Sequence, residues 1–289
     1  MAGREGPIGF DHAVDFYDET RGLSPEASRA TTDLLASQLR DCQRVLEVGI
    51  GTGLMALPLV KHGFHIDGVD LSEPMLQRLR EKISGSRISL AVADATRLPF
   101  RTGSVEGAYL RHVLHLIPDW RTAVAEVIRV VRPGGRILVS ITDYTGLYEE
   151  VQQRFLREAG DLPAAVGLQP DDPESLMAAM SKLGARGHRL PPVRGRRALT
   201  LNQFLEHIER GHYTWTWPAT EAERRGASRR VRAWLDRRFG DLDRPVEPEY
   251  TVEWWAFDLS QKPIEGADRL DPARNGVSAD QVGNQVPPS

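Results

Sequence analysis

Apolar residues follow two alternating patterns along the first half of the chain. Short continuous apolar runs are typical of buried strands, and runs in which apolar residues recur every three or four positions are typical of amphipathic helices. The first pattern predicts strands at 45–48, 64–69, 88–93, 105–110 and 136–142, with helical patterns between most of them. Strands that alternate with helices in this way favour an α/β fold with a doubly wound parallel sheet.

The second half of the chain loses this regular alternation. Helices are predicted at 148–159, 173–183 and 219–239, and Thr200 with Gln203 forms the pattern of a capping box before another helix. Further strands are predicted at 187–193 and 250–259. Beyond residue 260 apolar residues become sparse, which predicts a flexible tail over 261–289.

Composition narrows the cellular setting and the class of partner. The 289 residues carry a net charge of -3, so we expect no general affinity for nucleic acids or membrane surfaces. Cys42 is the only cysteine, which excludes an internal disulfide framework and fits a reducing cytoplasm. No apolar run is long enough to span a membrane and no secretory leader is evident, so a cytoplasmic protein is predicted.

Three glycines at alternate positions, Gly49, Gly51 and Gly53, separate the first predicted strand from a helix. Glycine accepts positive φ and lets a ligand approach the backbone, and the free N–H groups at a helix start can face that ligand. A purely structural turn has the same composition, so both interpretations stay open. Leu54 stands where the dinucleotide-binding fingerprint has its third glycine.

Two acidic residues favour the binding interpretation. Glu47 lies inside the first strand, where a carboxylate is costly unless it has a partner, and a cationic group on a ligand would be one. Asp70 ends the second strand, which is the usual position of an acid that accepts hydrogen bonds from a ribose diol. With the glycine turn, these acids predict a pocket for a ligand that contains a nucleoside.

Four motifs, in order, carry a family resemblance: VLEVGIGTG at 45–53, VDLSEPML at 69–76, ADATRLPF at 93–100 and VVRPGGRILV at 130–139. Over residues 10–143 the chain resembles the class I S-adenosylmethionine-dependent methyltransferases. Within them it resembles the small-molecule branch that includes the ubiquinone and menaquinone biosynthesis enzymes. The resemblance implies S-adenosyl-L-methionine as cofactor, and a Rossmann-like, mostly parallel seven-stranded sheet whose last strand is antiparallel.

The resemblance also implies a domain organisation. Residues 1–40 would form an N-terminal lid and the first helix, and residues 41–193 the cofactor-binding core with a helical segment at 144–185. Residues 194–249 would be a helical cap insertion, followed by the last strand of the core at 250–260. Such a cap would cover the carboxyl edge of the sheet, where ligands of doubly wound folds bind.

For the adenosine half of the cofactor, the resemblance assigns five residues. Asp70 would hold the ribose hydroxyls, and Leu71 and Met75 would sandwich the adenine. Asp94 and the backbone of Ala95 would read the adenine amino edge. Two alternatives stay open, because Leu71 and Met75 also suit an apolar core and Asp94 also suits a turn.

For the methionine half, the resemblance assigns Glu47 and the turn Gly49–Gly53, with the backbone of Arg111 facing the same end. Tyr17 and Arg21 lie in a stretch, YDETRG, that is similar to N-terminal segments covering the methyl donor in relatives. There Tyr17 would approach the sulfonium and Arg21 would contact a carboxylate. The alternative is a surface segment that docks on the domain without binding cofactor.

Catalytic candidates follow from the chemistry that the resemblance implies. Methyl transfer is an in-line displacement, in which the protein positions the acceptor and removes a proton if the acceptor is a phenol, an amine or an activated carbon. His112 and His115, just beyond the fourth strand, are candidate bases, and Tyr17 is a third catalytic candidate. A hydrogen-bonded structural role is the alternative for both histidines.

The cap offers residues for an aromatic or anionic small-molecule acceptor. Tyr213, Trp215 and Trp217 alternate in sequence and would point the same way, either walling the acceptor or forming the cap's own core. Arg194, Arg196 and Arg197 suit an anionic group or a solvated loop. The scattered histidines and the single cysteine give no metal-binding pattern.

Two rival functions use the same motifs. A nucleotide-dependent Rossmann oxidoreductase is disfavoured by Leu54 and by the Pro-Gly-Gly before the fifth strand. A non-catalytic regulator that binds S-adenosylmethionine is disfavoured because every expected cofactor position is present. Whether the methyl group goes to oxygen, nitrogen or carbon is left open by the sequence.

Overall fold

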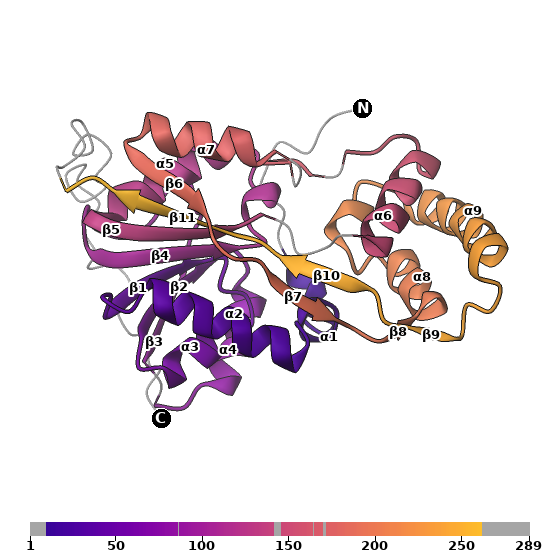
Figure 1. Cartoon of the computed structure of the whole chain (residues 1–289), viewed down its shortest axis with the longest axis horizontal. Coiled ribbons are helices and arrows are strands. Elements are labelled where there is room, and N and C mark those ends of the chain that lie inside the picture. The colour runs from indigo at the N-terminus through magenta and orange to yellow at the C-terminus, as the bar shows by residue number, and fades with distance from the viewer. Residues whose placement is uncertain (1–9, 86, 142–145, 164, 170–171, 262–289) are drawn as a thin grey trace, which may run out of the picture.

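The computed structural model describes residues 10–85, 87–141, 146–163, 165–169 and 172–261 (Figure 1). The tail predicted at 261–289 lies outside the described residues apart from Gln261, as do the first nine residues of the predicted lid.

The central sheet has the strand order β3-β2-β1-β4-β5-β11-β6. Its strands are β1 (Arg44–Val48), β2 (His65–Asp70), β3 (Ile88–Val92), β4 (Val105–Arg111), β5 (Val131–Ser140), β6 (Ala185–Arg189) and β11 (Trp254–Leu259). Strands β1 to β5 pair in parallel, whereas β11 runs antiparallel to both β5 and β6. The predicted seven-stranded, mostly parallel, Rossmann-like sheet with an antiparallel last strand is confirmed.

Helices cover both faces of this sheet, and each face has its own apolar cluster beneath the helices. On one face lie α2 (Pro25–Gln38), α3 (Ala56–Lys61) and α4 (Glu73–Lys82), with side chains such as Leu35 and Leu76 in the cluster. On the other face lie α5 (Trp120–Val130) and α7 (Pro173–Lys182), with Val127 and Met180 in the cluster. Burial on both faces explains why the parallel strands read as continuous apolar runs.

Three further helices form a separate unit beside the sheet, which we call the cap (Figure 1). They are α6 (Leu147–Glu158), α8 (Leu201–Glu209) and α9 (Glu221–Phe239), with the short elements β8 (Leu199–Thr200), η3 (Thr214–Thr216) and β9 (Pro245–Val246). The predicted capping box of Thr200 and Gln203 starts α8. The helical segment 144–185 was predicted to belong to the core. In the structure its first helix, α6, instead contributes its apolar face to the cap cluster.

A two-stranded ribbon joins the cap to the sheet. It pairs β7 (Val193–Arg196) with β10 (Glu249–Val252) in antiparallel fashion. The prediction of one strand over 250–259 is therefore wrong, because the chain divides at Glu253 into β10 of the ribbon and β11 of the sheet. The strand predicted at 187–193 ends early, at Arg189, and β6 lies at the edge of the sheet, as Pro191 and Pro192 in the sequence favour; proline removes a donor that a continuous strand needs.

The N-terminal segment 10–21, which we call the lid, contains η1 (Asp11–Ala13) and α1 (Tyr17–Arg21). It contacts the carboxyl edge of the sheet on one side and the cap on the other. A short helical turn, η2 (Leu114–Leu116), follows β4 at the same edge.

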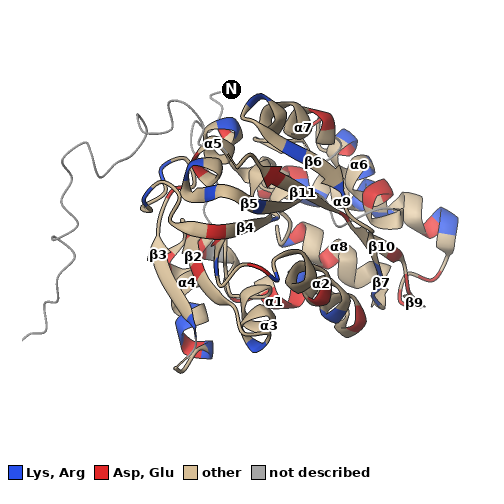
Figure 2. Cartoon of the chain, turned by 60° about the vertical axis from the view of Figure 1, so that its left-hand side comes forward, with Lys and Arg blue, Asp and Glu red and all other residues tan. Residues whose placement is uncertain are grey.

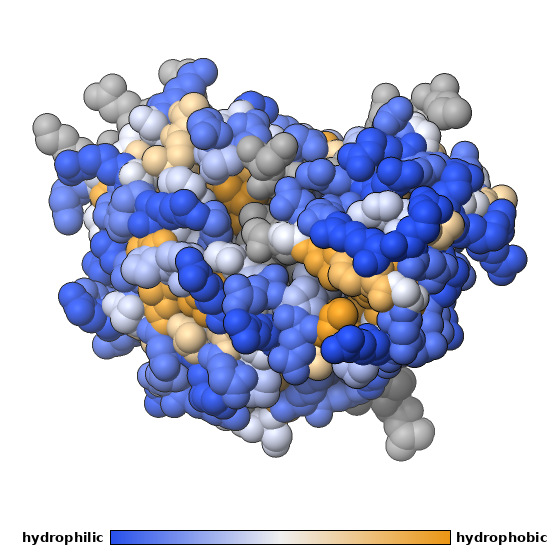
Figure 3. All heavy atoms as spheres, turned by 45° about the vertical axis from the view of Figure 1, so that its right-hand side comes forward, coloured by the Kyte–Doolittle hydropathy of each residue, from blue (hydrophilic) through white to orange (hydrophobic). Residues whose placement is uncertain are grey.

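The outer surface is mixed in character. Acidic and basic residues are interspersed over the helices (Figure 2), and apolar side chains reach the face seen in Figure 3 only in separate patches among hydrophilic residues. Within the described part of the chain, none of the helices combines the length and apolar character needed to cross a bilayer.

Candidate active site

A pocket lies where the direction of strand addition reverses, between β1 and β4. The carboxyl ends of parallel strands leave a crevice at such a switch point, which is where ligands bind in open α/β sheets. The pocket and its opening to solvent together contain about 640 Å³ of empty space. Its lining residues are Phe10, Tyr17, Val48, Gly49, Gly51, Val69, Asp70, Leu71, Met75, Ala93, Asp94, Ala95, His112, Val113, Leu116 and Ile117.

The glycine turn after β1 forms the floor of the pocket. Gly49 has a φ of 74°, and a Cβ added to it would lie 2.9 Å from Cγ2 of Val113. Gly53 has a φ of 84°, and a Cβ there would lie 2.5 Å from Cδ1 of Leu79. Glycine is therefore required both by the backbone conformation and by the close approach of its neighbours. Gly53 supports the turn but is not among the lining residues.

Asp70 links the first two turns of the pocket. Its Oδ2 accepts a hydrogen bond from the backbone N–H of Gly51 at 2.8 Å, and its Oδ1 accepts one from the N–H of Ser72 at 2.9 Å. Burial raises the pKa of Asp70, and hydrogen bonds from the backbone N–H groups of Ser72, Gly51 and Leu71 oppose that rise.

The predicted adenine side combines apolar walls with a second acid. Met75 is buried, whereas Leu71 lines the pocket with 41% of its surface exposed. Asp94 lines the pocket and also forms a turn, since its Oδ1 accepts from the N–H and the Oγ1 of Thr96, both at 2.8 Å. The two interpretations of Asp94 from the sequence are thus compatible. Ala95 lines the pocket beside it.

Glu47 is buried behind the pocket and is not among its lining residues. Its Oε2 accepts a hydrogen bond from the hydroxyl of Tyr109 at 2.6 Å. Burial raises the pKa of Glu47 to about 8, against the opposing effects of this hydrogen bond and of the Arg111 charge. The partner that the sequence left open is therefore a protein hydroxyl from β4.

The lid supplies two aromatic side chains to the pocket. The rings of Phe10 and Tyr17 meet edge to face with centroids 5.7 Å apart, and the Tyr17 ring lies over Gly51. Burial raises the pKa of Tyr17 to about 12, so its hydroxyl stays protonated at neutral pH. Tyr17 can donate a hydrogen bond there but does not act as a base.

The two candidate histidines differ in their relation to the pocket. His112 lines it, and His115 does not, although their rings lie 6.1 Å apart. His112 has a φ of 54°, a left-handed conformation that costs a non-glycine residue about 1 kcal/mol. Such strain persists only where the surrounding structure enforces it, and it is concentrated at functional sites.

The predicted arginines lie beside the pocket and not in its lining. Arg111 ends β4, is buried, and its charge lowers the pKa values of Tyr17 and Glu47. Arg21 donates to the carbonyl oxygen of His212 at 3.5 Å, and its guanidinium lies over the ring of Tyr213. Arg21 therefore connects the lid to the cap.

The cap aromatics do not share one direction. Tyr213 and Trp215 are buried in the cap cluster and stack with centroids 5.3 Å apart, because residues 214–216 form a helical turn and not a strand. Trp217 instead contacts Phe10 of the lid. The alternation predicted from the sequence is wrong for Trp217. Tyr213 and Trp215 belong to the cap's own core, and Tyr213 also lines a cavity beside it.

A second cavity, with about 730 Å³ of empty space, lies between α1 and the cap. Its lining includes the aromatic side chains of Tyr148, Phe204 and Tyr213, with Arg197 and His207 as basic groups. Arg194 and Arg196 are exposed, and Arg196 pairs with Glu249. Of the three arginines singled out in the sequence, Arg197 alone is among the lining residues.

Several lining residues have no signal in their local sequence. Val113, Leu116 and Ile117 enter the pocket through η2, and Phe10 enters through the lid. For Phe10, the signal in the sequence is a repeated pair of an aromatic residue followed by an acid, at Phe10-Asp11 and Tyr17-Asp18.

Comparison with known proteins shows similarity both in sequence and in fold. Residues 46–139 match the family described as a methyltransferase domain. A demethylmenaquinone methyltransferase from Mycolicibacterium gilvum is 33% identical over 172 residues, which cover 56% of this chain and 72% of that protein. One from Clavibacter sepedonicus is 31% identical over 135 residues, which cover 45% of this chain and 55% of that protein. The chain thus spans only part of the length of these curated relatives.

The fold comparison agrees. The YcgJ protein from Bacillus subtilis superposes with a TM-score of 0.54 at 17% identity, covering 81% of this chain and 100% of that chain. At this identity the match shows the fold alone, and the sequence matches supply the family. The chain therefore belongs to the class I S-adenosylmethionine-dependent methyltransferases, as its motifs predicted.

Proposed function

We propose that this protein transfers the methyl group of S-adenosyl-L-methionine to a small-molecule acceptor. The observation that carries the proposal is the pocket at the β1/β4 switch point, whose lining has the chemistry of that cofactor.

The lining residues fit a cofactor that carries an adenosine. Among the described lining residues are the acids Asp70 and Asp94 and no lysine or arginine. Carboxylates at these two positions can accept hydrogen bonds from ribose hydroxyls and from the amino group of adenine. The exposed surface of Leu71, with Met75 beneath, suits a planar base that would cover it.

Each cofactor-binding residue then has a role in the proposal. Asp70 would accept hydrogen bonds from the ribose, while Leu71, Met75, Asp94 and Ala95 would hold the adenine. The methionine half would lie near the glycine turn and Tyr17. Arg111 and Arg21 would act from behind the lining through their positive charges, whereas Glu47, protonated at neutral pH, would act through its hydrogen bond with Tyr109.

When bound, S-adenosyl-L-methionine supplies a methyl group activated on a positively charged sulfur. His112, the histidine in the lining, would take the proton of a phenol, amine or activated carbon. His115, whose ring centroid lies 6.1 Å from that of His112, would help to hold the His112 ring in position. Tyr17, protonated at neutral pH, would orient the reacting groups without accepting a proton.

The acceptor would approach from the lid and cap side. The cavity between α1 and the cap combines aromatic walls with Arg197, which supports an aromatic acceptor that carries an anionic group. The demethylmenaquinone methyltransferases among the relatives support phenolic and quinol-like molecules as the first acceptors to try.

We place this activity in the cytoplasm, because the net charge and the single cysteine suit a reducing, soluble setting.

The first test is isothermal titration of the protein with S-adenosylmethionine and S-adenosylhomocysteine. We expect micromolar binding by the wild type. Asp70→Ala should weaken it by about 100-fold, because charge-assisted hydrogen bonds to two hydroxyls are lost. Asp41→Ala, at an exposed acid, is the matched control and should bind like the wild type. Methyl transfer to a phenolic panel is then followed with a labelled methyl group.

No binding of either compound by folded wild-type protein would overturn the proposal. Binding of a nicotinamide dinucleotide in their place would support the oxidoreductase. Binding of S-adenosylmethionine with no turnover on any small molecule would support the non-catalytic regulator.

A further inference from the structure

The lid repeats one short pattern, an aromatic residue followed by an aspartate. Phe10 precedes Asp11, and Tyr17 precedes Asp18. Both rings line the cofactor pocket. Because each acid is adjacent in sequence to a ring in the pocket, whatever holds the acid also fixes the ring.

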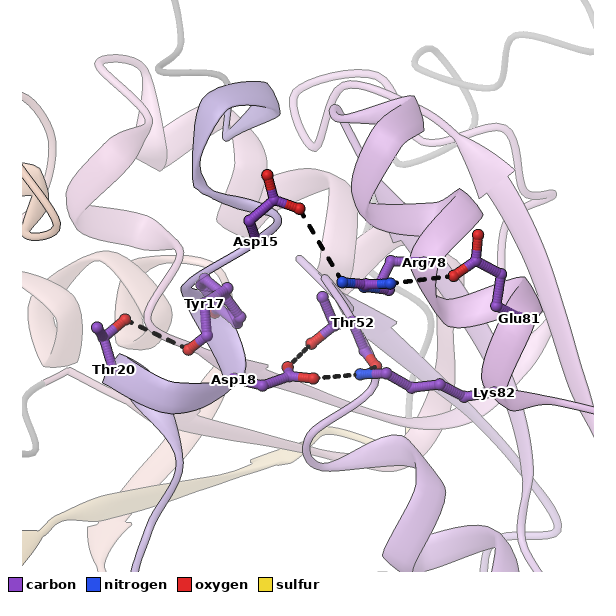
Figure 4. A network of polar contacts seen from close by, with 8 residues as sticks. All are labelled: Asp15, Tyr17, Asp18, Thr20, Thr52, Arg78, Glu81 and Lys82. Atoms are coloured by element: carbon purple, nitrogen blue, oxygen red, sulfur yellow. Dashed lines mark hydrogen bonds and ion pairs between the residues drawn. The ribbon is translucent and has the colours of Figure 1, made fainter.

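Asp18 is held at the glycine turn (Figure 4). One of its carboxylate oxygens accepts a hydrogen bond from the Oγ1 of Thr52, which is fully buried between Gly51 and Gly53. The other pairs with the Nζ of Lys82 at 2.5 Å, and the same Nζ donates to the carbonyl oxygen of Thr52 at 3.0 Å. Asp18, Thr52 and Lys82 thus form a closed set of contacts between α1, the glycine turn and α4.

Asp11 is held in the same way at the second turn of the pocket. Its carboxylate accepts a hydrogen bond from the Oγ of Ser72 at 2.6 Å. Ser72 is buried, caps α4, and donates its backbone N–H to Asp70. Each lid acid is therefore attached to a hydroxyl of a turn that forms the pocket itself, after β1 in one case and after β2 in the other.

We propose that Asp11 and Asp18 are positioning residues for cofactor binding: they bind the hydroxyls of Ser72 and Thr52 and so hold Phe10 and Tyr17 as one wall of the pocket. This inference rests on the proposed function. It adds that the affinity for cofactor depends on two side chains that do not touch it.

The lid needs such attachment. Helix α1 has five residues, and a helix of that length does not hold its conformation without tertiary contacts. The lid contacts the cap through Arg197, which donates to the carbonyl oxygens of Glu19 and Thr20, and through Arg21. The rings of Phe10 and Phe16 also meet the cap, at Trp217 and His212. Asp11 and Asp18 instead attach the lid to the turns that form the pocket itself.

The chain provides its own control. Asp15 lies in the lid between the two anchors, is 97% exposed, and approaches Arg78 only to 4.0 Å (Figure 4). Exposed pairs of this kind contribute little. Asp15→Ala therefore removes an equal charge from the same segment without removing an anchor.

The test is a double-mutant cycle read by titration with S-adenosylhomocysteine. Asp18→Ala should raise the Kd about tenfold, the value of a charge-assisted hydrogen bond at a partly exposed site. In a Tyr17→Ala background the same change should alter the Kd less than twofold, because Asp18 acts through Tyr17. Asp11→Ala with Phe10→Ala should behave alike, and Asp15→Ala should match the wild type.

The outcomes separate this inference from the proposed function. If the wild type does not bind S-adenosylhomocysteine, the proposed function falls and this inference with it. If the wild type binds and Asp18→Ala equals Asp15→Ala, this inference alone is overturned. Equal effects of Asp18→Ala in both backgrounds would also overturn it, because they indicate general loss of structure.

Asp18→Asn covers the case in which Asp18→Ala fails to fold. It keeps an acceptor for Thr52 and loses the charge that pairs with Lys82, so a Kd above that of the wild type, by less than tenfold, is expected. A Kd equal to that of the wild type would remove Lys82 from the argument and contradict the charge-assisted anchor.

Discussion

The sheet half and the cap half of this molecule place their functional residues by different means. In the sheet, residues from consecutive turns meet at one edge because parallel strands end there, as Gly49, Asp70 and Asp94 do. In the cap, the cavity is assembled from α6, α8 and the lid, segments that are far apart in the chain. The first arrangement follows from strand order, and the second follows from side-chain contacts alone.

The two halves also have separate cores. Apolar clusters on the two faces of the sheet contain the strands and their helices, whereas the cap cluster is built from α6, α8 and α9. Cofactor binding is thus supported by a core that the cap does not share. We expect mutations to affect stability and cofactor binding independently in the cap, and together in the sheet.

Among the substitutions that would test whether the two cores are separate, Trp215→Ala should have the largest effect. Trp215 stacks on Tyr213 and meets Phe155 edge to face inside the cap cluster. Its truncation should cost about 3 kcal/mol or more of unfolding free energy. Hydrogen exchange should show the loss in cap amides, while the Kd for S-adenosylhomocysteine changes less than threefold.

Phe239→Ala is the control for this experiment, since Phe239 is partly exposed at the end of α9 and should cost under about 1 kcal/mol. A large loss of S-adenosylhomocysteine affinity in Trp215→Ala would show that the two halves are one energetic unit.

A smaller effect concerns pH, and it distinguishes buried from exposed acids. Burial raises the pKa of Glu47 from the ordinary value near 4.5 to about 8. The folded state therefore holds a proton that the unfolded state has lost. This contribution to stability is present below about pH 4.5 and is lost as the pH rises to about 8.

Between pH 5 and 8, the unfolding free energy of the wild type should therefore fall relative to that of Glu47→Gln. The fall should be at least about 1.4 kcal/mol, which is the free energy that corresponds to one pKa unit. Urea unfolding of both proteins at several pH values measures this difference. For Glu158 in the cap, Arg230 and Arg154 lower the pKa, so its contribution to stability is lost only as the pH falls below about 4.5. Glu158→Gln should therefore show the same pH dependence as the wild type between pH 5 and 8. Parallel pH curves for wild type and Glu47→Gln would contradict the burial argument.

The smallest effect is expected for Arg197→Ala, on the cap side of the lid. Its guanidinium donates to backbone carbonyl oxygens of Glu19 and Thr20 at a half-buried position. We expect a loss under about 1 kcal/mol of stability, and a Kd for S-adenosylhomocysteine within twofold of the wild type. A tenfold weaker Kd would mean that the lid depends on the cap as much as on the sheet.

The contrast between the halves also explains what the sequence could predict. Glycines, a strand-ending acid and capped helices are local signals, and parallel strand order converts them into a shared edge. For that reason the local signals were enough to predict a pocket at the glycine turn and Asp70, both of which line it. Met75, Asp94 and the seven-stranded topology were predicted from the family resemblance that the motifs carry.

Contacts between distant segments could not be predicted in this way. The hydrogen bond from Tyr109 to Glu47 joins neighbouring strands that are 62 residues apart, and nothing near Glu47 in the sequence indicates it. The association of α6 with α8 and α9 depends on which apolar face meets which. The alternation at 213–217 failed because a helical turn replaced the strand that the alternation requires.

The β7–β10 ribbon bears on how proteins of this kind diversify. Arg196 and Glu249 are paired at its far end, so the chain leaves for residues 197–248 and returns from them at neighbouring positions. A segment with adjoining ends can be lengthened, shortened or replaced during evolution without moving a strand of the sheet. The helix α6 sets the limit of that freedom, because it arises elsewhere in the chain and any replacement has to match its apolar face.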